Sequence, residues 1–281
     1  MRLALLATCA FFAVVTGCAS TGPLAPKAIA LNDQGAKALQ ADDLEHAEAE
    51  LGLALEYNPR FTEAWVNLGL VEMRLGHYEK AHHDFHKAIE LNPDLPAPFH
   101  GRGLLEEKTG EIEKAEKSYR EALKVDPGFG PARVNLGRLL FARHDYDGAR
   151  EQFLRLTEVS PSTVEGWSGL VESMLRLHRD HEADQLLDQA REKLGERPAF
   201  ILLVARRLLR QGDVASAVAA LDPITRDGNP KIQAAAFAWI AVARAAQGDV
   251  EASRSAAHKA LEIDPKNDVA LYATKVRTNV D

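Results

Sequence analysis

Apolar residues recur at helical spacing along most of the chain, and the best-defined example lies between residues 65 and 91. The stretch from Trp65 to Arg74 has the pattern of one amphipathic helix. Further on, Ala81, Phe85 and Ala88 stand at i, i+4 and i+7, which places one apolar stripe on a second helix. The loop between them contains Gly76, a residue type that often caps the end of a helix. This pattern predicts pairs of helices joined by short loops.

The arrangement returns every 34 residues. Three residue types keep this period independently: Ala47, Ala81, Ala115, Ala149, Ala183 and Ala217; Pro59, Pro93, Pro127 and Pro161; Gly35, Gly69, Gly103 and Gly137. We expect the glycine where a second helix approaches closely and the proline where the second helix ends, because its ring cannot continue the hydrogen-bond ladder. Since no single pair buries its apolar face alone, neighbouring pairs must stack.

The second copy of this pattern resembles the tetratricopeptide repeat (TPR). Its residues at the signature positions of that family are Trp65, Leu68, Gly69, Ala81, Phe85, Ala88 and Pro93. The resemblance implies an all-α fold, a TPR α-solenoid in which helix-turn-helix repeats form a right-handed superhelix. Each repeat then has a first helix, called helix A below, and a second, called helix B. The repeat is widespread, so the resemblance names no partner.

We place seven repeats at 28–61, 62–95, 96–129, 130–163, 164–197, 198–233 and 234–267, followed by a capping helix at 268–281 that contains Val269, Leu271, Tyr272 and Val276. The last three repeats depart from the pattern. Val171 replaces the close-contact glycine, Gly195 the terminal proline and Ser253 the loop-proximal alanine. The sixth repeat also carries extra residues near 227–230. These departures leave the twist of the C-terminal repeats open, but not their helical nature.

The N-terminus has the form of a secretory signal, because Arg2 precedes a short apolar run from Leu3 to Val15. About 13 apolar residues are too few to span a hydrocarbon core of ~30 Å permanently. The sequence Val15-Thr16-Gly17-Cys18 resembles a bacterial lipobox. We therefore assign residues 1–17 to a lipoprotein signal peptide and 18–27 to the lipidated Cys18 and its tether. An uncleaved anchor or an ordinary cleaved signal is the alternative.

The lipobox resemblance implies that Cys18 carries a thioether-linked diacylglycerol and an N-linked acyl chain such as palmitate. Several buried acyl chains hold a protein to a bilayer in a stable manner. Ala19 and Ser20 follow the cysteine, and in lipoproteins of enteric-type bacteria the absence of aspartate there permits export to the outer membrane. We expect a lipid-anchored protein on the periplasmic face of the outer membrane of a Gram-negative bacterium.

Composition narrows the range of partners. The 281 residues carry a formal net charge of −7 without a basic block, which argues against nucleic acid as a partner. The two cysteines are Cys9 and Cys18, and Cys9 leaves with the signal peptide. We therefore expect neither a disulfide nor a thiolate metal site in the mature chain.

Motifs of catalysis are nearly absent. His181-Glu182 begins like a zinc-protease helix, but Gln185 stands where the second histidine is required. His82 and His86, at i and i+4 beside His77 and His83, could chelate a divalent ion, yet Ala81, Phe85 and Ala88 define the inward stripe of that helix. We expect these histidines on a solvated face, and no metal, cofactor, small-molecule substrate or enzymatic activity. Turnover that depends on His82 or His86 is the remaining enzymatic hypothesis.

The inner face of the A helices is the predicted binding surface. In the TPR family this concave groove holds extended or helical peptides. Projection by register assigns to it Asn67, Met73, Arg74, His100, Asn135, Arg138, Phe141, Arg206 and Arg210. Asn67 and Asn135 occupy the position where some relatives grip a peptide backbone, and the arginines Arg138, Arg206 and Arg210 suit an acidic partner. The alternative is that these are ordinary solvated helix residues. The residue set of a chaperone-type carboxylate clamp is missing.

The lipobox and the repeats together favour a non-enzymatic scaffold that binds other envelope proteins. The chain is similar in this respect to the small lipoproteins that assist type IV pilus secretins, Tad-type secretion and gliding motility. A periplasmic adaptor that recruits peptidoglycan hydrolases or synthases is the alternative function.

Overall fold

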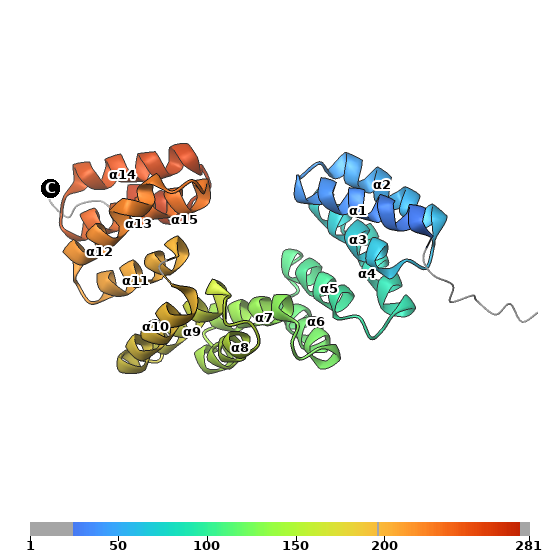
Figure 1. Cartoon of the computed structure of the whole chain (residues 1–281), viewed down its shortest axis with the longest axis horizontal. Coiled ribbons are helices and arrows are strands. Elements are labelled where there is room, and N and C mark those ends of the chain that lie inside the picture. Colours follow the sequence, from blue (N-terminus) through green and yellow to red (C-terminus); the bar gives the residue numbers. More distant parts are fainter. Residues whose placement is uncertain (1–24, 196, 276–281) are drawn as a thin grey trace, which may run out of the picture. The chain divides into compact units, whose positions relative to one another are not determined.

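The computed structural model describes residues 25–195 and 197–275, and in these ranges the regular structure is helical, without strands. The signal peptide at 1–17, Cys18 with most of its tether, and Val276 lie outside the described residues. The chain divides inside one helix into two compact units, the first ending at Lys87 and the second beginning at Ala88. Each unit is built from helix hairpins (Figure 1).

The helices alternate along the chain as the repeat pattern predicts. The first unit contains α1 (Pro26–Gln40), α2 (Leu44–Tyr57), α3 (Thr62–Leu75) and most of α4 (Tyr78–Leu91). The second contains α5 (Pro96–Lys108), α6 (Ile112–Val125), α7 (Gly130–Ala142), α8 (Tyr146–Val159), α9 (Val164–Arg176), α10 (Asp180–Leu194), α11 (Pro198–Arg210), α12 (Val214–Leu221), the 3-10 helix η1 (Asp222–Arg226), α13 (Pro230–Ala246), α14 (Val250–Ile263) and α15 (Asp268–Lys275). Odd numbers from α1 to α13 are A helices and even numbers from α2 to α14 are B helices. The predicted all-α fold is confirmed.

The periodic glycine lies where helix A meets a large side chain of its own helix B. A Cβ atom on Gly69 would stand 2.7 Å from Cε1 of Phe85, and one on Gly103 would stand 2.5 Å from Cε1 of Tyr119. Both rings are fully buried. The absence of a side chain at these positions therefore lets the ring lie directly on the backbone of helix A, as the sequence pattern predicts.

Four of the B helices, α2, α4, α6 and α14, end in a turn that contains an Asn-Pro or Asp-Pro pair. The residue before proline is restricted to extended backbone, and Asn58, before Pro59, has φ −147° and ψ 92°. Its side-chain oxygen accepts a hydrogen bond of 2.9 Å from the backbone N–H of Arg60. Asp126, before Pro127, does the same for the N–H of Gly128 at 2.8 Å. The proline and the polar residue before it together end helix B.

Two details of the C-terminal repeats differ from the simple period. The helix B of the sixth repeat stops at Leu221 and continues as the 3-10 helix η1, because Pro223 cannot supply the N–H that an α-helix requires. In α9, Gly169 lies close to the preceding repeat and not to its own helix B: an added Cβ would stand 2.5 Å from Phe153 of α8. Val171, the residue at the expected glycine position, is fully buried.

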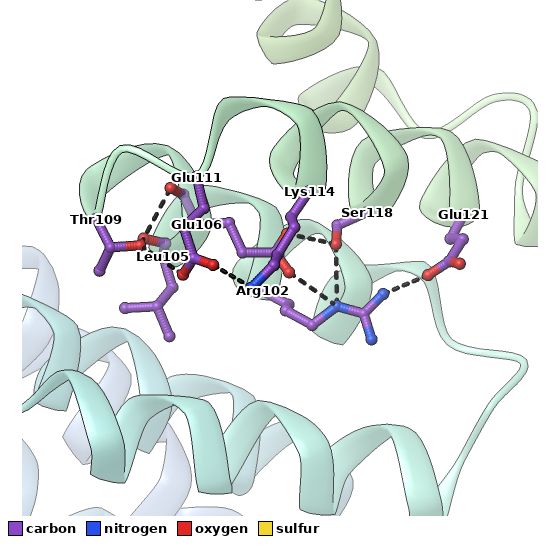
Figure 2. A network of polar contacts seen from close by, with 8 residues as sticks. All are labelled: Arg102, Leu105, Glu106, Thr109, Glu111, Lys114, Ser118 and Glu121. Atoms are coloured by element: carbon purple, nitrogen blue, oxygen red, sulfur yellow. Dashed lines mark hydrogen bonds and ion pairs between the residues drawn. The ribbon is translucent and has the colours of Figure 1, made fainter.

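A polar network ties α5 to α6 in the second unit (Figure 2). The side chain of Ser118 is buried, and its hydroxyl donates to Glu106 Oε2 at 2.6 Å while it accepts from Arg102 Nε at 3.0 Å. The far end of the Arg102 guanidinium pairs with Glu121. Because Ser118 is small, the Arg102 side chain on α5 can reach across to Glu121 on α6. These contacts fix the two helices of the hairpin relative to each other.

A partly buried histidine joins two successive A helices of the second unit. His100 on α5 lies between the rings of Tyr119 and Phe129, at centroid distances of 5.8 and 5.6 Å. Asn135 Nδ2 on α7 is 2.8 Å from His100 Nε2, so the amide donates to the neutral ring. Burial lowers the pKa of His100 from 6.5 to about 4, because it disfavours the charged imidazolium.

Replacing Gly69 by alanine tests the close approach of α3 and α4. We expect Gly69→Ala to destabilise the protein by about 1–3 kcal/mol, because the new methyl group overlaps the Phe85 ring. The matched control is Gly52→Ala in α2, where an added Cβ meets nothing within 4 Å. That variant should gain about 0.5–1 kcal/mol from helix propensity. Urea denaturation measures both, and a stabilising Gly69→Ala would contradict the packing.

The low pKa of His100 predicts an acid-sensitive component of stability. Between pH 6.5 and 4 the unfolded chain takes up a proton at this residue that the folded chain refuses. Stability from this group is therefore complete above pH 6.5 and is lost as the pH falls toward 4, by up to about 3 kcal/mol.

His100→Gln keeps an acceptor for Asn135 but does not titrate, so it should flatten the decline of stability from pH 7 to 4. The control is His258→Gln, at an exposed position of α14. The difference in unfolding midpoint between each variant and the unsubstituted protein, followed against pH, checks the prediction. Equal acid sensitivity in His100→Gln and the unsubstituted chain would contradict it.

Candidate functional site

Several of the residues predicted to line the groove bridge neighbouring A helices. Asn67 Nδ2 on α3 donates to Asn32 Oδ1 on α1 at 2.9 Å. Arg74 donates to the carbonyl oxygen of Leu39 at 2.8 Å, in the last turn of α1, where carbonyl groups lack partners within the helix. Met73, the third predicted groove residue of the first unit, is partly buried. In this unit the inner face is thus engaged in holding one repeat against the next.

In the second unit Asn135 is engaged in the same way with His100, as described above. Arg210 on α11 repeats the contact of Arg74, with its guanidinium 3.4 Å from the carbonyl oxygen of Leu175 on α9. The bridging partners lie 35 residues apart in all four cases. These four side chains of the predicted groove thus contact the preceding repeat.

Four predicted residues meet in one depression formed by α7, α9, α11 and α13. Two cavities of about 350 and 360 Å³ lie there, and both are lined by Glu172 and Arg206. We call the combined depression the arginine hollow. Its charged and aromatic lining on the inner face is Arg138, Phe141, Glu172, Arg176, Arg206, Arg210 and Trp239. Of these, Glu172, Arg176 and Trp239 are absent from the sequence-based set.

Three arginines of the hollow converge on the carboxylate of Glu172. Arg206 Nη2 donates to Glu172 Oε2 at 3.0 Å. Arg176 Nε and Arg210 Nη1 lie 3.5 and 3.6 Å from Oε1. The Glu172 side chain is 17% exposed, so these ion pairs are only partly screened by water. One carboxylate therefore faces three guanidinium groups.

Aromatic rings support two of these guanidinium groups. Arg206 lies over the Trp239 ring at 5.1 Å, and Arg176 lies over the Phe141 ring at 5.7 Å. A guanidinium stacked on a ring keeps its N–H groups at the edge free for hydrogen bonds. Arg207, which also lines one cavity, is bound instead to Asp184 and Asp180 of α10 at 2.7 and 3.1 Å. The stacked arginines are thus held in position with donors to spare.

Two of the four histidines in and just before α4 pair with buried carboxylates, which the sequence did not predict. His82 and His86 are exposed, as predicted, and their rings stack at a centroid distance of 6.4 Å. His77 Nδ1, however, lies 2.6 Å from Oε2 of the buried Glu72, and His83 Nδ1 lies 3.0 Å from Oδ1 of the buried Asp84. Burial raises the pKa of Asp84 from 3.8 to about 6, against the opposing effect of His83.

Glu72 and Asp84 escaped the sequence analysis because their burial depends on packing between α3 and α4. Lys80 Nζ completes the pairing of Glu72 at 3.0 Å, and the Glu72 carboxylate raises the pKa of Lys80. In residues 25–195 and 197–275, no three His, Cys, Asp or Glu side chains are grouped so as to hold a metal ion. Nor does any helix in those ranges have the length and apolar character needed to cross a bilayer.

Comparison with known proteins identifies the helical repeat. Three family models, each described as tetratricopeptide repeat, match residues 62–95, 108–173 and 202–268. Together they cover more than half of the chain. No curated protein sequence matches it significantly.

Solved structures share the fold at low sequence identity. A tetratricopeptide repeat protein from Parabacteroides merdae ATCC 43184 is 19% identical, with a TM-score of 0.67, over 89% of this chain and 98% of its own. The pilF protein of Pseudomonas aeruginosa is 18% identical, with a TM-score of 0.55, over 75% and 95%. The Cut9–Hcn1 hetero-tetramer of the APC/C is 15% identical, with a TM-score of 0.58, over 88% and 50%. The helix pairs, their 34-residue period and the three family-model matches show that the chain belongs to the tetratricopeptide-repeat family.

Proposed function

We propose that this protein is a non-enzymatic scaffold, held by lipid on Cys18 at the periplasmic face of the outer membrane, that binds a protein partner on the inner face of its A helices. The observation that carries the proposal is the arginine hollow, a depression on α7, α9, α11 and α13 with unused hydrogen-bond donors. Binding pockets combine apolar walls with a few positioned polar groups, and the hollow has both.

The membrane anchor is proposed on the sequence around Cys18, which lies outside the described residues. The segment Val15-Thr16-Gly17-Cys18 follows a short apolar run, and Ala19 and Ser20 come directly after the cysteine. Anchoring confines the binding surface to the membrane and so raises its effective concentration toward membrane-embedded partners. A modest intrinsic affinity for a partner then suffices for stable association.

The partner is proposed to belong to an envelope machine, such as a type IV pilus secretin, a Tad secretion system or a gliding-motility complex, whose assembly the scaffold assists. The alternative is an adaptor for peptidoglycan hydrolases or synthases. Cross-linking in cells followed by solubilisation in detergent and mass spectrometry separates the two, because the cross-linked partner is a secretin or motility protein in one case and a cell-wall enzyme in the other.

Substitution of Cys18 tests the anchored scaffold. In a Gram-negative host, the unsubstituted protein should incorporate a clickable palmitate analogue and fractionate with the outer membrane. Cys18→Ala should lose the label, leave the membrane fraction and reduce assembly of the partner complex, since the thioether must form before cleavage exposes the amino group that takes the N-linked chain. Cys9→Ala is the matched control, because it removes the other cysteine and should change neither label nor location.

Unchanged labelling and membrane location in Cys18→Ala would contradict the anchor. Normal assembly of the partner complex in that variant would contradict the need for it. Ala19→Asp adds a separate arm: in a host with the enteric sorting rule it should keep the labelled protein in the inner membrane.

A further inference from the structure

The arginine hollow carries an excess of positive charge although the chain as a whole is acidic. The whole chain has a formal net charge of −7, yet Glu172 is the single acidic side chain that lines the two cavities. Facing it are Arg138, Arg176, Arg206 and Arg210, while Arg207 is neutralised by Asp184 and Asp180. An excess of cationic groups in a concave site on an acidic protein attracts an anionic ligand locally.

Register explains how this charge is built. Arg138, Glu172 and Arg206 are separated by one period of 34 residues each, so they occupy equivalent positions on α7, α9 and α11. Arg176 and Arg210 are likewise one period apart, one turn further along α9 and α11. A single carboxylate thus stands between arginines of neighbouring repeats, and it holds the repeats' guanidinium groups together without neutralising them.

Many donors of these arginines remain available. A guanidinium has five N–H donors, and Glu172 forms one hydrogen bond, with Arg206, together with looser ion pairs to Arg176 and Arg210. The Arg138 side chain forms no hydrogen bond or ion pair in the described part of the chain. Arg–carboxylate pairs are frequently bidentate, so free edges of this kind suit carboxylate groups.

The walls of the hollow are apolar. Leu175, Leu203, Leu209 and Val242 line one cavity beside Trp239, and Phe141 and Phe153 line the other. A ligand that is only an anion would leave these surfaces in contact with water. A peptide that carries both carboxylates and large apolar side chains covers them and meets the arginines at once.

We propose that the arginine hollow recognises an acidic peptide segment of the partner, in which Asp or Glu side chains alternate with large apolar ones. The carboxylates bind the free edges of Arg138, Arg206 and Arg210, and the apolar side chains pack on Trp239, Leu209 and Val242. Glu172 positions the arginines in the free protein and weakens the field that a ligand carboxylate meets. This inference rests on the proposed protein-binding function and names the chemistry of the partner.

Nucleic acid is a less suitable occupant of the same charge. The chain as a whole is acidic and repels a polyanion. Aliphatic side chains, among them Leu175, Leu209 and Val242, line one cavity beside Trp239, and they give a base less to stack on than an aromatic platform would. A single-stranded oligonucleotide that competes with the peptide would reveal nucleic acid as the occupant.

The experiment uses the full chain purified in detergent and an array of peptides of equal length. One set combines Asp or Glu with Leu, Phe or Trp; a second replaces every acid by its amide; a third replaces it by Lys. We expect the acidic set to bind about tenfold or more tightly than the amide set, with an affinity that falls at high salt. Equal binding of the amide or lysine sets would overturn the proposal.

Substitutions locate the binding. Arg138→Gln has no hydrogen bond to lose in the described fold, so it should remain folded and weaken acidic peptides about tenfold. The matched control is Arg179→Gln, which removes the same charge at an exposed position of the turn before α10. It should leave affinity unchanged. Equal affinities in the two variants, or Arg138-dependent binding of a single-stranded oligonucleotide that displaces the peptides, would overturn the proposal.

Glu172→Gln tests the part assigned to this carboxylate. Loss of its charge should raise the affinity for acidic peptides several-fold, because the arginines then pair with the ligand carboxylates alone and no longer with Glu172. Unchanged or weaker binding would contradict that part. Failure here is distinct from failure of the proposed scaffold: peptide binding can fail while Cys18-dependent complexes persist in cells, and it can succeed while Cys18→Ala is located normally.

Discussion

The contact between the bare backbone of helix A and a large side chain of helix B is the constraint on which the rest depends. At Gly69, Gly103 and Gly137, the rings of Phe85, Tyr119 and Phe153 occupy the space of a Cβ atom, at distances of 2.5 to 2.9 Å. Close packing of this kind leaves no room for a larger residue. It brings the two helices of a hairpin together, which directs the remaining faces of helix A toward the neighbouring repeat and the inner surface.

A polar residue on that inner surface has one of two environments. Where the preceding repeat offers a partner, as Asn32 does for Asn67 and His100 does for Asn135, the side chain becomes part of the repeat interface. Where it does not, the side chain faces a depression. Arg138 has no such partner, and Arg206 shares Glu172 with other arginines. Binding capacity thus accumulates in the second unit, where cationic residues outnumber the carboxylate between them.

Much of the fold could be predicted from the sequence because three residue types repeat every 34 residues, each for one local reason. Glycine allows a close helix approach, alanine lies on the inward stripe of helix B, and proline ends that helix. The break at Pro223 and the additional close contact of Gly169 with Phe153 of the preceding repeat were harder to predict, because neither follows the 34-residue period. Register found Arg138, Phe141, Arg206 and Arg210. It missed Glu172 and Trp239, although a step of one period from Arg138 falls on Glu172. Whether a projected residue bridges or binds depends on its neighbour, which the period alone does not specify.

The central claim is that the partner sits in the arginine hollow, and a photo-activated cross-linker tests it most directly. The amino acid p-benzoyl-phenylalanine is placed at Ala142, an exposed residue that lines the hollow, or at Gln189, an exposed residue of α10 away from it. After irradiation of living cells, the account predicts a defined adduct from Ala142 that is lost when Arg138 is replaced by Gln, and none from Gln189. An adduct from Gln189 with none from Ala142 would contradict it.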